Sequence, residues 1–131
     1  MQQQTHNRIN SDLVGRPLEV ENDHFARVSL VTNKEMVADD TGLIHGGFTF
    51  GLADYAAMLA VNQPNVVLTR AEVQYLQPVK LGDILLALAR VTEKQERKRL
   101  VEVEIRVADR EVFQGKFMCY LPEKHVLTTE G

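Results

Sequence analysis

The feature that most constrains the fold is a long apolar segment interrupted by a single carboxylate. Between Gly47 and Asn62 the one charged residue is Asp54, and the alanine, leucine and methionine around it favour helix. Pro64 ends the segment, because proline lacks the N–H that a helix interior needs. A helix that is apolar on every side has to be enclosed by protein. We therefore predict one central helix with the rest of the chain wrapped around it.

The segments on either side of this helix alternate between apolar and polar residues, as strands do. Short turns separate them, which predicts an antiparallel sheet and an α+β architecture. The nearly continuous apolar run over residues 84–91 predicts a strand covered on both faces. The expected elements are loose residues 1–7, a short helix over 9–14 lying as a lid on the sheet edge, two extended pieces within 18–32, strands over 66–77, 84–91, 101–107 and 112–121, a charged hairpin tip over 92–99, and a tight turn at 109–110.

Length and composition narrow the class of protein. The chain has 131 residues, which we interpret as one domain spanning residues 1–131, and its 44% hydrophobic and 25% charged content is ordinary for a soluble globular protein. A net charge of −3 argues against a nucleic-acid partner. The apolar segment is too short and too glycine-rich to cross a membrane, which takes about 20 apolar residues. A single cysteine, Cys119, and the lack of a signal-peptide pattern predict a cytoplasmic protein.

Asp54 has two interpretations within an apolar helix. In the first it is a structural carboxylate bonded to nearby backbone or to an arginine, since burying a carboxylate without partners is costly. In the second it acts with Gly46 and Gly47, which lie where the first helical N–H groups have no helical acceptor and can stabilise a negative oxygen. A buried carboxylate and an oxyanion donor are the pair that acyl-transfer chemistry needs.

Two segments resemble a known family. They are the H-G-G at residues 45–47, followed by an aspartate eight residues after Gly46 in L-A-D-Y-A, and Y-L-Q-P-V-K-L-G-D at residues 75–83. Together they resemble the hotdog-fold thioesterases of the 4-hydroxybenzoyl-CoA thioesterase-like superfamily, most closely the phenylacetyl-CoA-pathway type. The resemblance covers roughly residues 15–121. It implies a curled antiparallel sheet around one long central helix, and hydrolysis of a small or medium acyl- or aryl-CoA thioester.

The resemblance also assigns roles to residues. Asp54 is expected to be the catalytic carboxylate, acting as a base on water or as a nucleophile. Gly46 or Gly47 is expected to donate a backbone N–H to the thioester oxygen, and His45 closes the approach loop unless it is simply a packed histidine. Coenzyme A enters as part of the substrate, with no cofactor and no metal, because the four histidines are scattered along the chain.

Seven further residues are candidates for binding the substrate: Asp39, Phe48, Met58, Thr69, Arg97, Lys98 and Arg99. The family often has Asn or Gln seven residues before the first glycine, where this chain has Asp39. Met58 stands one turn beyond Asp54, where some relatives carry a hydroxyl, and Thr69 is placed to reach the neighbouring carboxylate. Phe48 suggests an apolar acyl pocket. The basic run at 97–99 is a candidate for the phosphates of coenzyme A, and a solvated hairpin tip explains it equally well.

The spacing of the two catalytic elements predicts a dimer. Gly47 and Asp54 stand roughly 10 Å apart along a helix, whereas reacting atoms must lie within about 3.5 Å. Another subunit must therefore complete the site, and the resemblance implies the same for a homodimer or homotetramer. The alternative function, from a different class, is a non-catalytic acyl-CoA-binding or sensing protein of the same fold.

Overall fold

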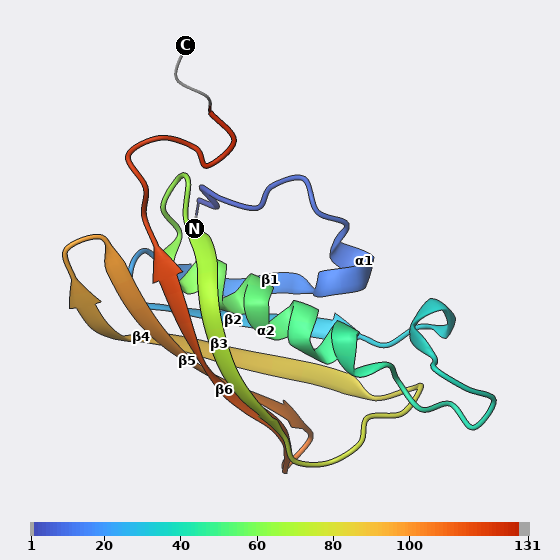
Figure 1. Ribbon diagram of the computed structural model, residues 1–131. Helices are drawn as coiled ribbons and strands as arrows, with labels where there is room; N and C mark the ends of the chain where they lie inside the picture. The colour runs from blue at the N-terminus through green and yellow to red at the C-terminus, as the bar shows by residue number, and fades with distance from the viewer. Residues whose placement is uncertain (1, 129–131) are drawn as a thin grey trace.

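Six antiparallel strands form one sheet that curls around the central helix α2 in the computed structural model, which describes residues 2–128 (Figure 1). The strand order is β1-β2-β4-β5-β6-β3, so the strand that follows α2 lies at an edge of the sheet. The elements are α1 Ser11–Val14, β1 Arg16–Glu21, β2 Phe25–Val31, a 3₁₀ turn Lys34–Met36, α2 Gly46–Val61, β3 Val67–Tyr75, β4 Ile84–Gln95, β5 Lys98–Val107 and β6 Arg110–Tyr120. This is the predicted α+β architecture.

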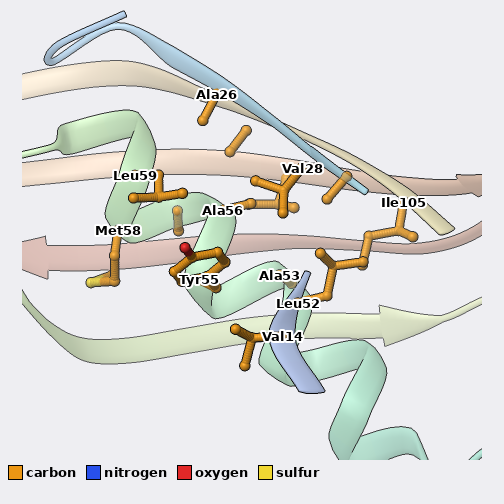
Figure 2. Close-up of a cluster of buried hydrophobic side chains, with 14 of the residues drawn as sticks. Val14, Ala26, Val28, Leu52, Ala53, Tyr55, Ala56, Met58, Leu59 and Ile105 are labelled. Atoms are coloured by element: carbon orange, nitrogen blue, oxygen red, sulfur yellow. The ribbon is translucent and has the colours of Figure 1, made fainter. Parts of the chain in front are cut away.

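Helix α2 is buried along most of its length, as its sequence predicts, but a stripe on its N-terminal half that includes Asp54 keeps part of its surface exposed. Both Leu52 and Leu59 are fully buried, and burial of each leucine side chain contributes about 2 kcal/mol. The inner face of the sheet supplies alternate residues such as Val28 and Ile105, which lie around the helix in Figure 2. Within residues 2–128 no helix is long and apolar enough to cross a membrane.

The N-terminal segment covers the side of α2 that the sheet leaves open. Gln3 donates a hydrogen bond to the Tyr55 hydroxyl, and the Gln4 backbone N–H donates to the side chain of Asn62. Asn62 is buried, ends α2 in the left-handed conformation and also donates to the Gln2 carbonyl. The prediction that residues 1–7 are loose is therefore wrong for the described residues, because the helix end provides hydrogen-bond partners for their backbone.

The first helix is shorter than expected and has a different role. It begins after the Asn10 cap and ends after one turn at Gly15, whose φ is 111°. Val14 contacts α2 beside Gly51, and Ile9 is exposed. The helix therefore packs against α2 and is not a lid on the sheet edge.

Strand boundaries also differ from the predictions. The charged tip expected over residues 92–99 is mostly strand, because β4 and β5 stay paired out to Gln95 and Lys98 and turn at Glu96 and Arg97. Charged side chains are tolerated there because the extension is open to solvent. The turn before β6 falls at 108–109, one residue earlier than expected. In β4 the face carrying Leu85 is buried and the face carrying Leu86 is half-buried, so full coverage of both faces is not seen in the single chain.

Alanine substitutions at Gly15 and Gly82 test how closely the turn at Gly15 packs on the core. Both have positive φ, but a Cβ at Gly15 would lie 2.8 Å from Val28 Cγ1 and 3.0 Å from Leu52 Cδ1, whereas nothing lies within 4 Å at Gly82. We expect Gly82→Ala to lower the free energy of unfolding by about 1 kcal/mol, through backbone strain alone. Gly15→Ala should lower it by about 3 kcal/mol, because overpacking adds to that strain. Urea unfolding measures both, and equal losses would contradict the close approach.

Candidate active site

The loop before α2 is fixed from two sides, which sets the position of the helix start. The His45 N–H donates to the Met36 carbonyl at 2.9 Å, and the Ile44 N–H donates to the Val79 carbonyl at 2.8 Å. Asp39 organises the turn within this loop by accepting from the Thr41 N–H at 2.9 Å and the Thr41 hydroxyl at 2.6 Å. These hydrogen bonds lower the pKa of Asp39. Asp39 therefore shapes the approach to the helix, and its contact with substrate stays a prediction.

His45 caps α2 and makes the backbone N–H groups of the two glycines differ in their availability. Its Nδ1 accepts a hydrogen bond from the Gly47 N–H at 2.8 Å, so that donor is occupied. For the Gly46 N–H no acceptor is found within residues 2–128. Of the two backbone donors predicted from the sequence, the one at Gly46 is free to bind a ligand oxygen, and the helix dipole adds to its attraction for negative charge.

Tyr75 is a residue of this site that the sequence analysis missed. It ends the edge strand β3, and its hydroxyl donates to the Gly46 carbonyl at 2.8 Å. A Cβ on Gly46 would lie 3.0 Å from the Tyr75 ring, so the ring packs directly on the glycine. The tyrosine belongs to the recognised Y-L-Q-P segment, but nothing in the spacing of that segment predicts contact with the helix start.

Asp54 is a partly buried carboxylate within the apolar helix. One of its carboxylate oxygens, Oδ1, is buried and finds no hydrogen-bond partner within residues 2–128. Desolvation raises its pKa. Cys119 lies close enough on β6 that burial, together with the Asp54 charge, raises the thiol pKa to about 12. The structural interpretation, a carboxylate bonded to backbone or arginine, does not describe this oxygen.

Gly46 and Asp54 lie toward opposite ends of strand β3. Tyr75, which contacts Gly46, is the last residue of that strand, whereas Cys119, beside Asp54, pairs with Leu68 near its beginning. Along the helix the eight residues from Gly46 to Asp54 correspond to about 12 Å. One thioester cannot contact both groups of a single chain, as the sequence spacing indicates.

The other candidate residues are dispersed. Phe48 is half-buried and meets the His45 ring edge-on at 6.2 Å between centroids, whereas Met58 is fully buried among core residues. The Thr69 hydroxyl donates to the Met118 carbonyl at 3.1 Å, in the bulge near the start of β3. Their roles toward a substrate stay predictions.

The basic run is already engaged in ion pairs. Arg99 pairs with Asp23 at 2.8 Å and Arg97 with Glu123 at 3.2 Å, while Lys98 is exposed. Asp23 also donates its backbone N–H to the Val61 carbonyl, so this turn lies at the C-terminal end of α2, away from Gly46 of the same chain. These pairs compete with any phosphate, and binding of coenzyme A by the run stays a prediction.

Asp54→Asn should stabilise the fold at neutral pH. Because burial raises the pKa of Asp54, the folded protein binds the proton more tightly than the unfolded chain does. This contribution to stability is complete below the ordinary pKa of 3.8 and is lost as the pH rises through the raised pKa. The amide does not titrate, so we expect the free energy of unfolding of the variant to exceed that of the wild type by about 1 kcal/mol at neutral pH. Urea unfolding over a pH series should show the difference shrinking toward pH 3.8, and a pH-independent difference would contradict the assigned desolvation.

The chain is similar to proteins of several kinds. The family model described as "Thioesterase superfamily" matches residues 41–114, which include His45, Gly46 and Asp54. An uncharacterized Pyrococcus horikoshii protein of known structure is 51% identical, with a TM-score of 0.95 and 98% of each chain covered. A Streptococcus mutans protein solved with acetyl-CoA has a TM-score of 0.80, covering 92% of this chain and 98% of that one. At 22% identity it shows the fold alone.

Two curated relatives are longer than this chain. A protein of Aquifex aeolicus named methylthioribose-1-phosphate isomerase is 50% identical over 113 residues, which are 86% of this chain and 25% of that protein. Transcription factor FapR of Caldanaerobacter subterraneus is 29% identical over 119 residues, 91% of this chain and 60% of FapR. The chain thus spans a quarter of one relative and three-fifths of the other. The family model and the shared architecture confirm the hotdog fold, and the chain belongs to the thioesterase superfamily.

Proposed function

We propose that the protein is an acyl-CoA thioesterase acting on a small or medium acyl or aryl thioester. Two groups on one helix carry the proposal: the buried Oδ1 of Asp54 and the Gly46 N–H at the helix start, neither of which has a hydrogen-bond partner within residues 2–128. A raised pKa makes the ionised carboxylate a stronger base, as proton abstraction from water requires. Membership of the thioesterase superfamily and the acetyl-CoA bound to a protein of the same fold support the substrate class.

The proposed active unit is a twofold dimer joined through β3. One side of this nine-residue edge strand has no partner strand within residues 2–128, and such an edge can pair with another strand. The other edge, β1, is less suited because it contains Pro17 and a bulge. An antiparallel pairing of two β3 strands centred between Ala71 and Glu72 would place Leu68 of one copy opposite Tyr75 of the other. That symmetry would bring Gly46 of one chain toward Asp54 of its mate.

In the proposed reaction the thioester carbonyl oxygen accepts a hydrogen bond from the Gly46 N–H, and the helix dipole stabilises the negative charge that develops on that oxygen. Asp54 of the mate takes a proton from water while the water oxygen bonds to the carbonyl carbon. The C–S bond then breaks, and the coenzyme A thiolate leaves and is protonated. Direct attack by the carboxylate, followed by hydrolysis of the resulting anhydride, is the other route open to the same residue.

Two substitutions test the assigned groups with a panel of short, long and aromatic acyl-CoAs. Asp54→Asn should lower kcat by about 10²–10⁴-fold, because the amide can neither accept the proton nor attack. Gly46→Pro removes the proposed donor at a helix position where proline is well tolerated, and the extended ψ of 130° at His45 suits a following proline. We expect it to lower kcat by about 10²–10³-fold.

Gly46→Ala is the matched control, since it adds the same Cβ against Tyr75 but keeps the N–H. Its loss of kcat should stay within about tenfold, because it keeps the N–H and disturbs only the packing of Tyr75. Equal damage from alanine and proline would show that the Tyr75 contact, rather than the N–H, is responsible. Full turnover by Asp54→Asn would refute the catalytic carboxylate.

Mixing two inactive variants tests whether the site is shared between subunits. A heterodimer of Asp54→Asn with Gly46→Pro would contain one intact site, formed by the glycine of one chain and the aspartate of the other. Random reassociation gives heterodimers in half of the molecules, so we expect about a quarter of wild-type activity. A mixture as inactive as its components, although mass spectrometry shows that heterodimers form, would place both groups in one chain.

A non-catalytic acyl-CoA sensor is the second candidate, because the chain is similar to transcription factor FapR over most of its own length. Calorimetry separates the two functions. Saturable acyl-CoA binding with no thiol release across the panel would favour the sensor.

A further inference from the structure

The start of α2 carries a hydrogen-bond chain that the proposed reaction does not use. The Tyr75 hydroxyl donates to the Gly46 carbonyl at 2.8 Å, and the Gly47 N–H donates to His45 Nδ1 at 2.8 Å. The Gly46 carbonyl and the Gly47 N–H belong to the same peptide unit. These hydrogen bonds therefore connect the edge strand to the helix cap without a break.

This arrangement fixes the proton on the His45 ring. A backbone N–H can only donate, so Nδ1 must present its lone pair, and the proton of the neutral ring is on Nε2. Donation into the peptide carbonyl polarises the peptide and strengthens donation by its N–H. Tyr75 thus reinforces the bond that selects the tautomer, although it does not touch the imidazole.

Tyr75 is held where this bond requires it. Its ring meets Phe113 edge-on, with centroids 5.2 Å apart and an interplanar angle of 86°, and the two residues are partners in the β3–β6 ladder. The next residue, Leu76, donates its N–H to the Val112 carbonyl. On the helix side, glycine at position 46 is what allows the ring to approach, because a Cβ there would lie 3.0 Å from a ring carbon.

We infer that Tyr75 is a positioning residue, which fixes the Gly46–Gly47 peptide and through it selects the tautomer of the neutral His45 ring that carries its proton on Nε2. Along the chain, the Gly46 N–H lies between the His45 side chain and the Gly46–Gly47 peptide that Tyr75 fixes. Tyr75 therefore sets the geometry of both potential donors to a ligand oxygen at this helix start. Its effect on turnover rests on the proposed thioesterase function, whereas its effect on His45 does not.

Tyr75→Phe tests the inference, because it keeps the ring against Gly46 and Phe113 and removes only the hydroxyl. Tyr120→Phe is the matched control, since Tyr120 lies on β6 and its hydroxyl has no hydrogen bond within residues 2–128. Protein labelled with ¹⁵N-histidine is compared by two-bond ¹H–¹⁵N correlation at about pH 8.5, where an ordinary imidazole is neutral. The His45 signals are assigned by their loss in His45→Gln.

In the wild type we expect the Nε2–H tautomer of His45 to predominate. In Tyr75→Phe the ratio of Nε2–H to Nδ1–H should fall about twofold or more. The Gly47 amide proton should move upfield by more than any change that Tyr120→Phe causes there. An unchanged tautomer ratio and amide shift would overturn the inference, whatever the activity.

The kinetic arm uses the acyl-CoA that the wild type hydrolyses best. Tyr75→Phe should lower kcat about three- to tenfold, the loss of one hydrogen bond, and change KM less than twofold. Tyr120→Phe should change neither constant. An unchanged kcat in Tyr75→Phe would overturn the inference. If the wild type hydrolyses no acyl-CoA, the proposed function fails, and the spectra alone decide the role of Tyr75.

Discussion

The enclosure of helix α2 is the constraint on which the rest of the structure depends. Every face of a sixteen-residue helix is apolar, so most of its surface has to be covered by the rest of the fold. A flat sheet covers one side, and the observed sheet curls to cover more (Figure 1). The open side is closed by α1 and by the N-terminal segment, which is attached through Asn62 and Tyr55. Segments far apart in sequence are thus held together by the need to bury one helix.

The burial of α2 also sets the acidity of Asp54. An acid placed in a helix with no polar face loses much of its hydration. The pKa of Asp54 rises because its buried Oδ1 finds no donor within residues 2–128 to replace the lost water. The helix start has the opposite property, since its first N–H groups project beyond the hydrogen-bonded turns. The two features lie toward opposite ends of β3. In the proposed dimer, the twofold axis of the antiparallel β3–β3 pairing brings the helix start of one chain toward Asp54 of the other.

The sequence predicted the main elements because their patterns are long and regular. The apolar run identified α2 to within a residue, and the alternation over 101–107 identified β5. Short or polar segments were less predictable. The extension of β4 and β5 past Val91 is held by cross-strand pairing and by Lys94 and Arg99 binding Asp23, and neither leaves an apolar pattern. Residues 2–7 were misjudged for a similar reason, since their partners are some sixty positions away.

The sequence by itself determined that a helix must be buried, that one acid lies within it, and that two glycines stand at its start. These follow from residue type and spacing, because hydrophobicity and helix periodicity are local properties. Tertiary structure decided which glycine keeps its N–H free, through the His45 ring that occupies the other. It also brought Tyr75 onto Gly46 and set Arg97 and Arg99 against acidic partners. Such contacts depend on where distant segments meet, and no local pattern of residues records that.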